Sequence, residues 1–354
     1  MEFNRIEIEN SHKEQLSHSI LIIYTGGTFG MAYDDVDGLI PFNFKDIMVN
    51  IPVLDKFDIR LTVDAAIKPL DSSNIEPNDW ITISKKIIDN YEHFDGFVIL
   101  HGTDTMAYTA SALSFLLKGI QKPVILTGAQ IPIGAIRSDA RENLITSIEI
   151  ASARSEDLPK IKEVCICFNE ELLRGNRSVK IRSSEFGAFE SLNYPVLAKA
   201  GIHIVYNDDV LWRDEMGPAF IVNPVFDDSV NILRIFPGLS PEVLESVMRI
   251  RGLKGLIIES YGSGNMSTQP WFLDRLQKGI EDGLIIINVS QCIGGKIDQG
   301  RYSTSRKLNE IGVISGKDIT TEAALSKLML LFGLFSDSKK IKEEFQKSWV
   351  GEIS

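Results

Sequence analysis

The sequence contains few of the residues that build metal sites or disulfide frameworks. It has three cysteines and five histidines in 354 residues. Neither an HExxH nor a CxxC pattern is present, so a structural or catalytic metal is not expected. Cys165 and Cys167 stand two residues apart in an apolar run, a spacing that directs both side chains to one face of a strand. We therefore expect these two thiols to be buried packing residues.

Long apolar stretches and an excess of basic charge are also absent. No uninterrupted apolar run approaches the ~20 residues that cross a bilayer, and the first residues carry charges throughout, unlike a secretory signal. Asp and Glu outnumber Lys and Arg by 48 to 37, and the resulting formal charge of -11 disfavours binding to phosphate backbones. Nucleotide-binding and serine-hydrolase fingerprints are missing as well. We expect a cytoplasmic protein with no membrane and no nucleic-acid partner.

Short apolar runs alternate with longer amphipathic segments along the chain. The apolar runs are continuous, which is typical of strands covered on both faces in a parallel sheet. They occupy residues 19–24, 94–101, 122–128, 162–168, 230–236, 254–260 and 283–289. Amphipathic segments over 105–118, 138–153 and 318–335 read as helices, and a further helix begins at Ser240. The pattern predicts α/β architecture with right-handed crossovers.

Two long aperiodic segments mark the organisation of the chain. Residues 206–229 hold several acids and two prolines without a clean period, and we interpret them as a connection. The prediction is a larger N-terminal domain with a mostly parallel sheet (1–208), a linker (209–228) and a smaller α/β C-terminal domain (229–354). Segment 29–45, which bears Gly and Asp, is long for a connection and is predicted to be a lid.

Polar residues suited to chemistry follow the predicted strands, where ligands of open α/β sheets bind. The two glycines of YTGGT (24–28) permit positive φ and a close backbone approach, which fits an anion-binding turn and a plain glycine turn equally. HGTDT (101–105) places Thr103 and Asp104 at a strand-to-helix junction. Either residue could cap the helix, whose free N–H groups would also suit an oxyanion.

Two loops each have a structural and a functional interpretation. RGNRSVK (174–180) is either a solvated basic surface or a loop that turns Lys180 inward beside Asp104, as a proton acceptor. The run 71–73, Asp-Ser-Ser, is either a turn or a hydroxyl-lined contact for a carboxylate. Spacing alone favours the surface and the turn. His101 follows an apolar strand and is expected to be a satisfied core histidine.

Together these motifs resemble those of the bacterial-type L-asparaginases, most closely the cytoplasmic type I branch. TGGT with HGTDT and a downstream lysine is a highly specific combination, although each motif alone is weak. The matches span nearly the whole chain in family order: YTGGTFGM (24–31), LDSSNIEPNDW (70–80), DGFVILHGTDTMAYTASALSF (95–115), PVILTGAQIP (123–132), RSDARENL (137–144), RGNRSVK (174–180), YGSGN (261–265) and SQCIGGKI (290–297).

The resemblance implies an amide hydrolase that converts L-asparagine to L-aspartate and ammonia through an acyl-enzyme and without a cofactor. Thr28, the second threonine of TGGT, matches the family's nucleophile. The second catalytic group is matched by Thr103, Asp104 and Lys180. The substrate-binding positions are matched by Ser72, Ser73, Thr103, Asp104 and Ala129. Family active sites lie between the subunits of a close dimer, often paired into a tetramer, so a homodimer or homotetramer is expected.

This chain departs from the type I pattern at two positions. A lid tyrosine that helps to activate the nucleophile in the family is replaced by Leu39. Tyr302, which matches a family position that reaches the nucleophile region in some members, is our preferred activator, and Tyr33 is the alternative. A local packing role fits Tyr302 equally well. Glu259 replaces the arginine with which some type I members bind regulatory asparagine, so weak or absent cooperativity is expected.

Other functions stay open at this stage. An L-glutaminase or a mixed glutaminase-asparaginase is the nearest, because one methylene in a pocket changes binding by only ~1–3 kcal/mol. A catalytically silent amino-acid sensor is the non-enzymatic alternative. A transamidation partner acting on aminoacyl-tRNA ranks low, because it would need an added domain and a basic surface.

Overall fold

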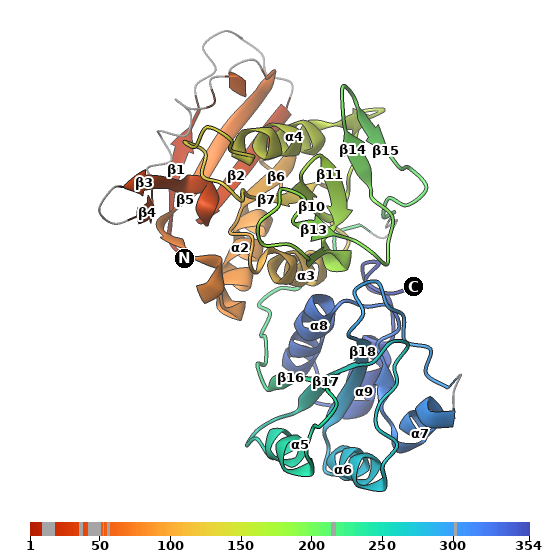
Figure 1. The fold of residues 1–354 in the computed structure, drawn as a ribbon. Coiled ribbons are helices and arrows are strands. Elements are labelled where there is room, and N and C mark those ends of the chain that lie inside the picture. Colours follow the sequence, from red (N-terminus) through yellow and green to blue (C-terminus); the bar gives the residue numbers. More distant parts are fainter. Residues whose placement is uncertain are drawn as a thin grey trace. The chain divides into compact units, whose positions relative to one another are not determined.

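The computed structural model describes residues 1–8, 18–34, 38–41, 51, 53–54, 57–213, 217–300 and 303–354, without the side chains of 31–34, 38–41 and 303–305. This part of the chain divides into two compact units, Met1–Ile221 and Val222–Ser354 (Figure 1). The boundary falls inside segment 209–228. The N–H groups of Ala219 and Ile221 donate to the carbonyls of Lys118 and Leu116, which attaches the end of the first unit to its own core.

The first unit contains a sheet of nine strands whose central members are parallel. Antiparallel strands extend the sheet at both edges. In spatial order the strands are β1 (Phe3–Glu7), β5 (Ile59–Leu70), β2 (His18–Gly26), β6 (Gly96–Leu100), β7 (Val124–Thr127), β10 (Val164–Phe168), β11 (Glu171–Arg174), β14 (Ala198–Ala200) and β15 (Ile204–Tyr206). The predicted mostly parallel α/β domain is therefore confirmed.

Helices cover both faces of this sheet. Helix α4 (Ala140–Ser152) packs Leu144 and Ile148 into a cluster with Ile20, Ile22 and both buried cysteines. Helices α2 (Pro77–Asp89) and α3 (Met106–Leu116) lie together on the other side (Figure 1). The burial of the two thiols confirms the prediction made from their spacing. Three short pairs complete the unit: β3 (Met31–Asp34) with β4 (Gly38–Pro41), β8 (Arg154–Ser155) with β9 (Leu158–Pro159), and β12 (Val179–Lys180) with β13 (Phe189–Glu190).

Strand β5 was not among the predicted strands, although it lies beside β2 in the sheet. Its polar residues interrupt the apolar run, and Asp64 is buried. Arg5 donates to both carboxylate oxygens of Asp64 at 2.8 Å, and Lys86 lies 3.2 Å away. Burial alone would raise the pKa of Asp64, but the hydrogen bonds from Arg5 and Lys86 lower it. The partners of this charge come from distant parts of the chain, so a local pattern did not reveal the strand.

The second unit is a smaller parallel α/β domain, as predicted. Ser240 caps helix α5 (Pro241–Met248), because its hydroxyl accepts from Val243 N, and Pro241 occupies the first turn. The strands in spatial order are β16 (Val230–Arg234), β17 (Gly255–Ser260), β18 (Ile285–Ser290) and β19 (Ile314–Ser315). The helices are α5 (Pro241–Met248), α6 (Pro270–Glu281), α7 (Ser303–Ile311), α8 (Thr321–Leu334) and α9 (Ser338–Phe345).

The first turn of α8 holds a buried carboxyl group, Glu322. Burial, together with the nearby charge of Glu259, raises the pKa of Glu322 to about 7. A carboxyl whose pKa is raised by folding stabilises the folded state at acidic pH and loses that contribution as the pH rises from about 4.5 to about 7. A shift of this size corresponds to about 3 kcal/mol.

We therefore predict that Glu322→Gln, relative to the parent, stabilises the protein more at pH 8 than at pH 5. Urea unfolding at the two pH values measures this difference. Glu343→Gln, at an exposed position of α9, is the matched control and is expected to show the same stability difference at both pH values. An equal effect of Glu322→Gln at both pH values would contradict the assignment.

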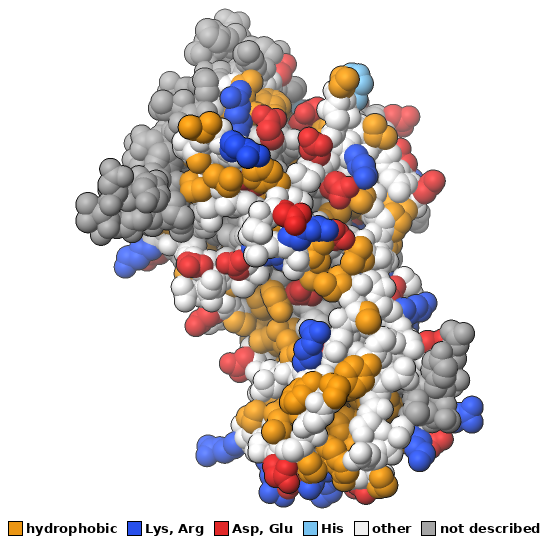
Figure 2. Space-filling view, in the orientation of Figure 1, with side chains coloured by type: hydrophobic (Ala, Val, Ile, Leu, Met, Phe, Trp, Pro, Cys, Tyr) orange, Lys and Arg blue, Asp and Glu red, His pale blue; other side chains and the backbone are white. Residues whose placement is uncertain are grey.

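Charges of both signs are interspersed over the visible surface. On the face seen in Figure 2, the described Lys and Arg side chains lie scattered among Asp and Glu, without a continuous basic band. None of the helices in the described part of the chain is long and apolar enough to span a membrane.

Candidate active site

The carboxyl ends of three adjacent parallel strands bring the predicted motifs to one edge of the sheet. Tyr24 of β2 pairs with Leu100 of β6, and Leu100 pairs with Thr127 of β7. The segments 25–28, 101–105 and 128–130 follow these pairs directly. Because parallel strands end on the same side, residues far apart in sequence converge here. This edge of the first unit is the candidate active site.

Close backbone packing between two of these segments depends on glycine. Gly27 has a φ of +84°, and a Cβ added there would lie 2.4 Å from the Cα of Gly102. A Cβ added to Gly102 would lie 2.5 Å from Ser72 Oγ. A side chain at Gly27 would force the two backbones apart, and one at Gly102 would displace the side chain of Ser72. The glycines of YTGGT therefore permit a close approach of neighbouring segments, in addition to forming a turn.

Thr103, Asp104 and Lys180 form one hydrogen-bonded cluster. Lys180 Nζ donates to Thr103 Oγ1 and to Asp104 Oδ1, each at 2.7 Å. The side chain of Lys180 is 16% exposed and that of Asp104 is 64% exposed, while Thr103 is buried. A partly exposed ion pair contributes only about 0–1 kcal/mol to stability. The ion pair therefore contributes little to the stability of the fold.

The segment that carries Lys180 is anchored in the first unit by buried arginine. Arg174 Nε lies 2.6 Å from Glu163 Oε2, and a second nitrogen of Arg174 donates to Val210 O at 2.9 Å. Arg177 is also buried. Downstream, Lys180 pairs with Phe189 across the β12–β13 pair. The solvated-surface interpretation of RGNRSVK is therefore wrong for both arginines, because their side chains lie inside the unit.

Ser72 lies next to this cluster, and Ser73 faces outward. Ser72 is buried in a short 3-10 helix (Ser72–Asn74), and Thr105 donates its hydroxyl to Ser72 O at 2.7 Å. Ser73 is exposed, and its N–H donates to Asp71 Oδ1. The expected turn is present, because Asn74 N also donates to Asp71 O. The turn does not exclude a substrate contact, since Ser72 Oγ remains adjacent to Gly102.

Thr28 begins a second short 3-10 helix, Thr28–Gly30, and is partly buried. Ala129 is buried at the end of the segment that follows β7. Tyr302 lies outside the described residues. Tyr33 and Leu39 are register partners in β3 and β4, whose backbone alone is described. Of the predicted lid over 29–45, residues 35–37 and 42–45 lie outside the described residues, and only the backbone is described for 31–34 and 38–41.

Sequence reasoning missed the residues that hold the segment after β7. The sequence offers both Ser138 and Asp139 as cap candidates for α4, and Ser138 Oγ accepts from Ala140 N. The Asp139 carboxylate accepts from the N–H groups of Gln130 and Ile131 at 3.0–3.1 Å. Gln130 Oε1 in turn accepts from Thr103 Oγ1 at 3.3 Å. In the sequence, Asp139 stands close to the segment that follows β7. This position did not indicate that its carboxylate binds the N–H groups of Gln130 and Ile131.

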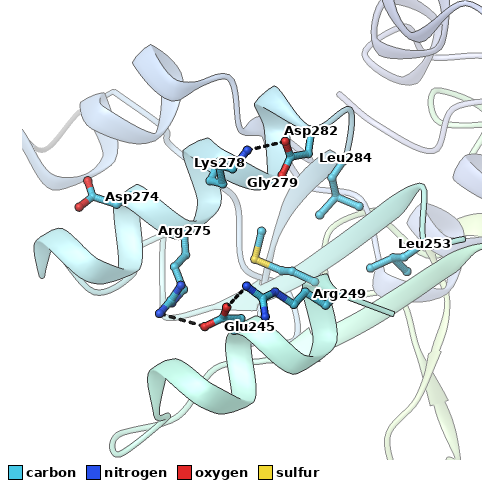
Figure 3. Close-up of a pocket in the computed structure, with 10 residues that line it drawn as sticks. Glu245, Arg249, Leu253, Asp274, Arg275, Lys278, Gly279, Asp282 and Leu284 are labelled. Atoms are coloured by element: carbon cyan, nitrogen blue, oxygen red, sulfur yellow. Dashed lines mark hydrogen bonds and ion pairs between the residues drawn. The ribbon is translucent and has the colours of Figure 1, made fainter. Parts of the chain in front are cut away.

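The second unit contains a hollow of about 290 Å³ between α5 and α6 (Figure 3). Five of the six charged residues that line it pair with one another, and Asp274 is the exception. Glu245 contacts Arg249 at 2.5 Å and Arg275 at 3.0 Å, and Lys278 lies 2.6 Å from Asp282. These pairs engage most of the charges that a polar ligand would need, so the strand-end site of the first unit is the stronger candidate. Among the described residues, no group of three or more His, Cys, Asp or Glu could hold a metal.

Comparison with known proteins identifies the family. Residues 19–212 match the sequence model of "Asparaginase, N-terminal", and residues 229–345 match "Glutaminase/Asparaginase C-terminal domain". The chain therefore belongs to the asparaginase family of enzymes.

Individual relatives agree with this assignment. L-asparaginase 1 of Escherichia coli K12 is 39% identical over 346 residues, covering 95% of this chain and 98% of the relative. L-asparaginase of Dirofilaria immitis is 39% identical over 338 residues, covering 87% of this chain and 56% of the relative. The crystal structure of L-asparaginase I from Vibrio cholerae matches with a TM-score of 0.85 and 37% identity, covering 95% of this chain and 99% of that one.

Proposed function

We propose that this chain hydrolyses the side-chain amide of L-asparagine to L-aspartate and ammonia, with Thr28 as the nucleophile. The observation that carries the proposal is the position of Lys180 Nζ, 2.7 Å from both Thr103 Oγ1 and Asp104 Oδ1, at the strand ends that also bear Thr28. An amine, a hydroxyl and a carboxylate in direct contact form a path for moving a proton. Amide hydrolysis by an alcohol requires such a path.

The chemistry proceeds in two stages. Thr28 Oγ1 attacks the amide carbon and gives up its hydroxyl proton. The C–N bond breaks, the proton goes to the departing nitrogen, and ammonia is released. An aspartyl ester remains on the threonine. Water then attacks the ester, and L-aspartate departs while Thr28 regains its hydroxyl hydrogen. A threonine hydroxyl is a weak nucleophile until a neighbouring base takes its proton, so both stages depend on the surrounding groups.

The proton path runs through Thr103. In the hydrogen-bonding state observed, Thr103 Oγ1 accepts from Lys180 and donates to Gln130. A hydroxyl can exchange its donor and acceptor directions by rotation, so Thr103 can also pass a proton toward the lysine. Asp104 holds the amine against Thr103. Tyr302 is our preferred activator of Thr28, with Tyr33 as the alternative.

Two backbone N–H groups are available for the negative charge that develops on the amide oxygen. The N–H groups of Thr28 and Thr103 form no hydrogen bond to another described residue. An oxyanion donor of this kind commonly contributes about 3 kcal/mol to the transition state.

The ends of the substrate are recognised by different groups. Asp104 is 64% exposed on its side chain and accepts the substrate's α-ammonium, while Ser72 contacts the α-carboxylate. Ser73 and Ala129 complete the substrate-binding set, with Ala129 at the amide end. The enzyme uses no cofactor, works in the cytoplasm, and forms a homodimer or homotetramer with active sites near the subunit interface.

L-glutamine is the second candidate substrate. The matched C-terminal family description includes glutaminase as well as asparaginase, and one additional methylene changes binding by only ~1–3 kcal/mol. A mixed glutaminase-asparaginase is therefore the specific alternative.

Ammonia release over a range of asparagine and glutamine concentrations tests this proposal. We expect turnover of asparagine with a larger kcat/KM than for glutamine, and a hyperbolic rate curve. The curve is expected to lack cooperativity because Glu259 presents a carboxylate that repels an amino-acid effector, and its oxygens are engaged by Thr321 at 2.8 Å and Arg234 at 3.6 Å. Absence of ammonia from asparagine would refute the function, and a sigmoidal curve would refute the statement about cooperativity.

A further inference from the structure

A chain of buried hydrogen bonds runs from α2 through α3 to the backbone of the candidate site. Trp80 Nε1 lies 3.1 Å from Thr109 Oγ1, and Thr109 Oγ1 lies 2.9 Å from His101 Nε2. His101 Nδ1 lies 2.7 Å from Gly102 O. All three side chains are buried. His101 is thus a satisfied core histidine, as predicted, but the group it contacts at one end belongs to the site.

The chemistry of the end groups fixes the direction of the two outer bonds in this chain, and the neutral state of the ring fixes the direction of the bond between Thr109 and His101. An indole N–H can only donate, and a carbonyl oxygen can only accept. His101 Nδ1 therefore carries the ring hydrogen and donates it to Gly102 O. Thr109 accepts from Trp80 and donates its own hydroxyl hydrogen to Nε2, which keeps the ring in one neutral tautomer. Burial lowers the pKa of His101 to about 4, in agreement with a neutral ring at pH 7.

The same contact sets the direction of the next backbone N–H. The peptide bond between Gly102 and Thr103 is trans, and in a trans peptide the C=O and N–H groups point in opposite directions. Because Gly102 O points to the His101 ring, Thr103 N–H points away from it. This N–H has no partner among the described residues. Gly27, which precedes Thr28, packs directly against Gly102.

We propose that Trp80, Thr109 and His101 are positioning residues that lock the Gly102–Thr103 peptide with its N–H ready for the oxyanion formed when Thr28 attacks. The inference rests on the proposed amide hydrolysis by Thr28. None of the three side chains touches the substrate or transfers a proton in this role. They act by preventing rotation of the Gly102–Thr103 peptide group. The N–H of that group therefore does not have to reorient when the negative charge develops.

Two pairs of variants test the proposal. Thr109→Val removes the hydroxyl at nearly constant volume, and His101→Leu removes both ring nitrogens. Losing an oxyanion donor typically lowers kcat 10²–10³-fold, and we expect a misdirected donor to lower kcat by about 10-fold to 100-fold. KM is expected to change less than about 3-fold, because the interaction forms in the transition state. Thr109→Ser restores the hydroxyl and His101→Asn restores a donor near the Nδ1 position, so both should recover most of the lost kcat.

A control separates this effect from damage to the fold. Ser114 is also buried on α3, where its hydroxyl donates to Ala110 O at 2.7 Å. Ser114→Ala removes a buried hydroxyl from the same helix and is expected to leave kcat unchanged. A fall in kcat for Thr109→Val equal to that for Ser114→Ala, or no recovery in the Ser and Asn variants, would overturn the proposal.

The tautomer of His101 provides a readout that does not require activity. Nitrogen NMR of the ¹⁵N-histidine-labelled wild-type protein at pH 7 is expected to show a neutral ring with hydrogen on Nδ1. Hydrogen on Nε2, or a charged ring, would overturn the proposal. Wild-type protein that releases no ammonia from asparagine would defeat the proposed function, whereas an active wild type with full kcat in Thr109→Val and His101→Leu would defeat the positioning role alone.

Discussion

Thr28→Ala is expected to abolish ammonia release from asparagine, with kcat lowered by about 10⁴-fold or more. The substitution removes the only atom that can carry the proposed acyl group. The fold should be preserved, because Thr28 is partly exposed and its hydroxyl has no hydrogen-bond partner among the described residues. Stability is expected to change by about 0.5 kcal/mol or less. Steady-state ammonia assays combined with thermal unfolding measure both quantities.

The other threonine of TGGT is the matched control for this variant. Thr25 is buried, and its hydroxyl donates to Leu100 O at 2.9 Å. Thr25→Val leaves that carbonyl without its donor and should destabilise the protein by about 1–3 kcal/mol, while turnover at moderate temperature is retained. The substitution of Thr28 is therefore expected to lower kcat, and that of Thr25 to lower stability. Activity of Thr28→Ala close to that of wild type would refute the assignment of the nucleophile.

Lys180→Met is expected to lower kcat by about 10²–10⁴-fold, the usual contribution of a positioned acid or base. The methionine side chain has a similar length but cannot exchange a proton with Thr103. KM for asparagine should change less than kcat, because Lys180 contacts Thr103 and Asp104 rather than the substrate. Lys180→Arg should not restore activity, since a guanidinium does not release a proton at neutral pH.

Arg182→Met is the neighbouring control for Lys180→Met. Arg182 lies two residues further along the chain, and its side chain pairs with Glu190 at 2.7 Å and with Glu185 at 3.4 Å rather than with Thr103 or Asp104. Its removal is expected to change kcat by less than about 3-fold. Equal activity of Lys180→Met and Arg182→Met would contradict the proton path.

The parallel core of both units could be predicted from the sequence because a buried parallel strand has a local signature. Continuous apolar runs correspond to the central strands β2, β6, β7 and β10 and to β16, β17 and β18. Strand β5 lacks that signature, since its buried Asp64 is stabilised by Arg5, 59 residues away in the chain. Compensation of a charge by a distant residue is invisible to any local pattern.

The candidate site could also be predicted from the sequence only in part. Glycines and threonines after the strands could be identified locally, and the convergence of parallel strand ends made a common site predictable. The pairing of Lys180 with Asp104 joins residues 76 positions apart and was only one of two interpretations until the resemblance to a family was considered. Arg174 looked like surface charge because its partner, Glu163, lies 11 residues earlier and is brought to it by the pairing of β10 with β11. The positioning chain through His101 depends on packing between helices and a strand end, which sequence spacing does not encode.

The identity of the residue that carries the acyl group is the most direct test of this account. Enzyme mixed rapidly with asparagine, quenched in acid within the first turnovers and digested for peptide mass analysis would reveal that residue. We predict one aspartyl ester on the peptide that contains Thr28, absent from Thr28→Ala. An aspartyl ester on Thr103, or on any other side chain, during active turnover would contradict the account.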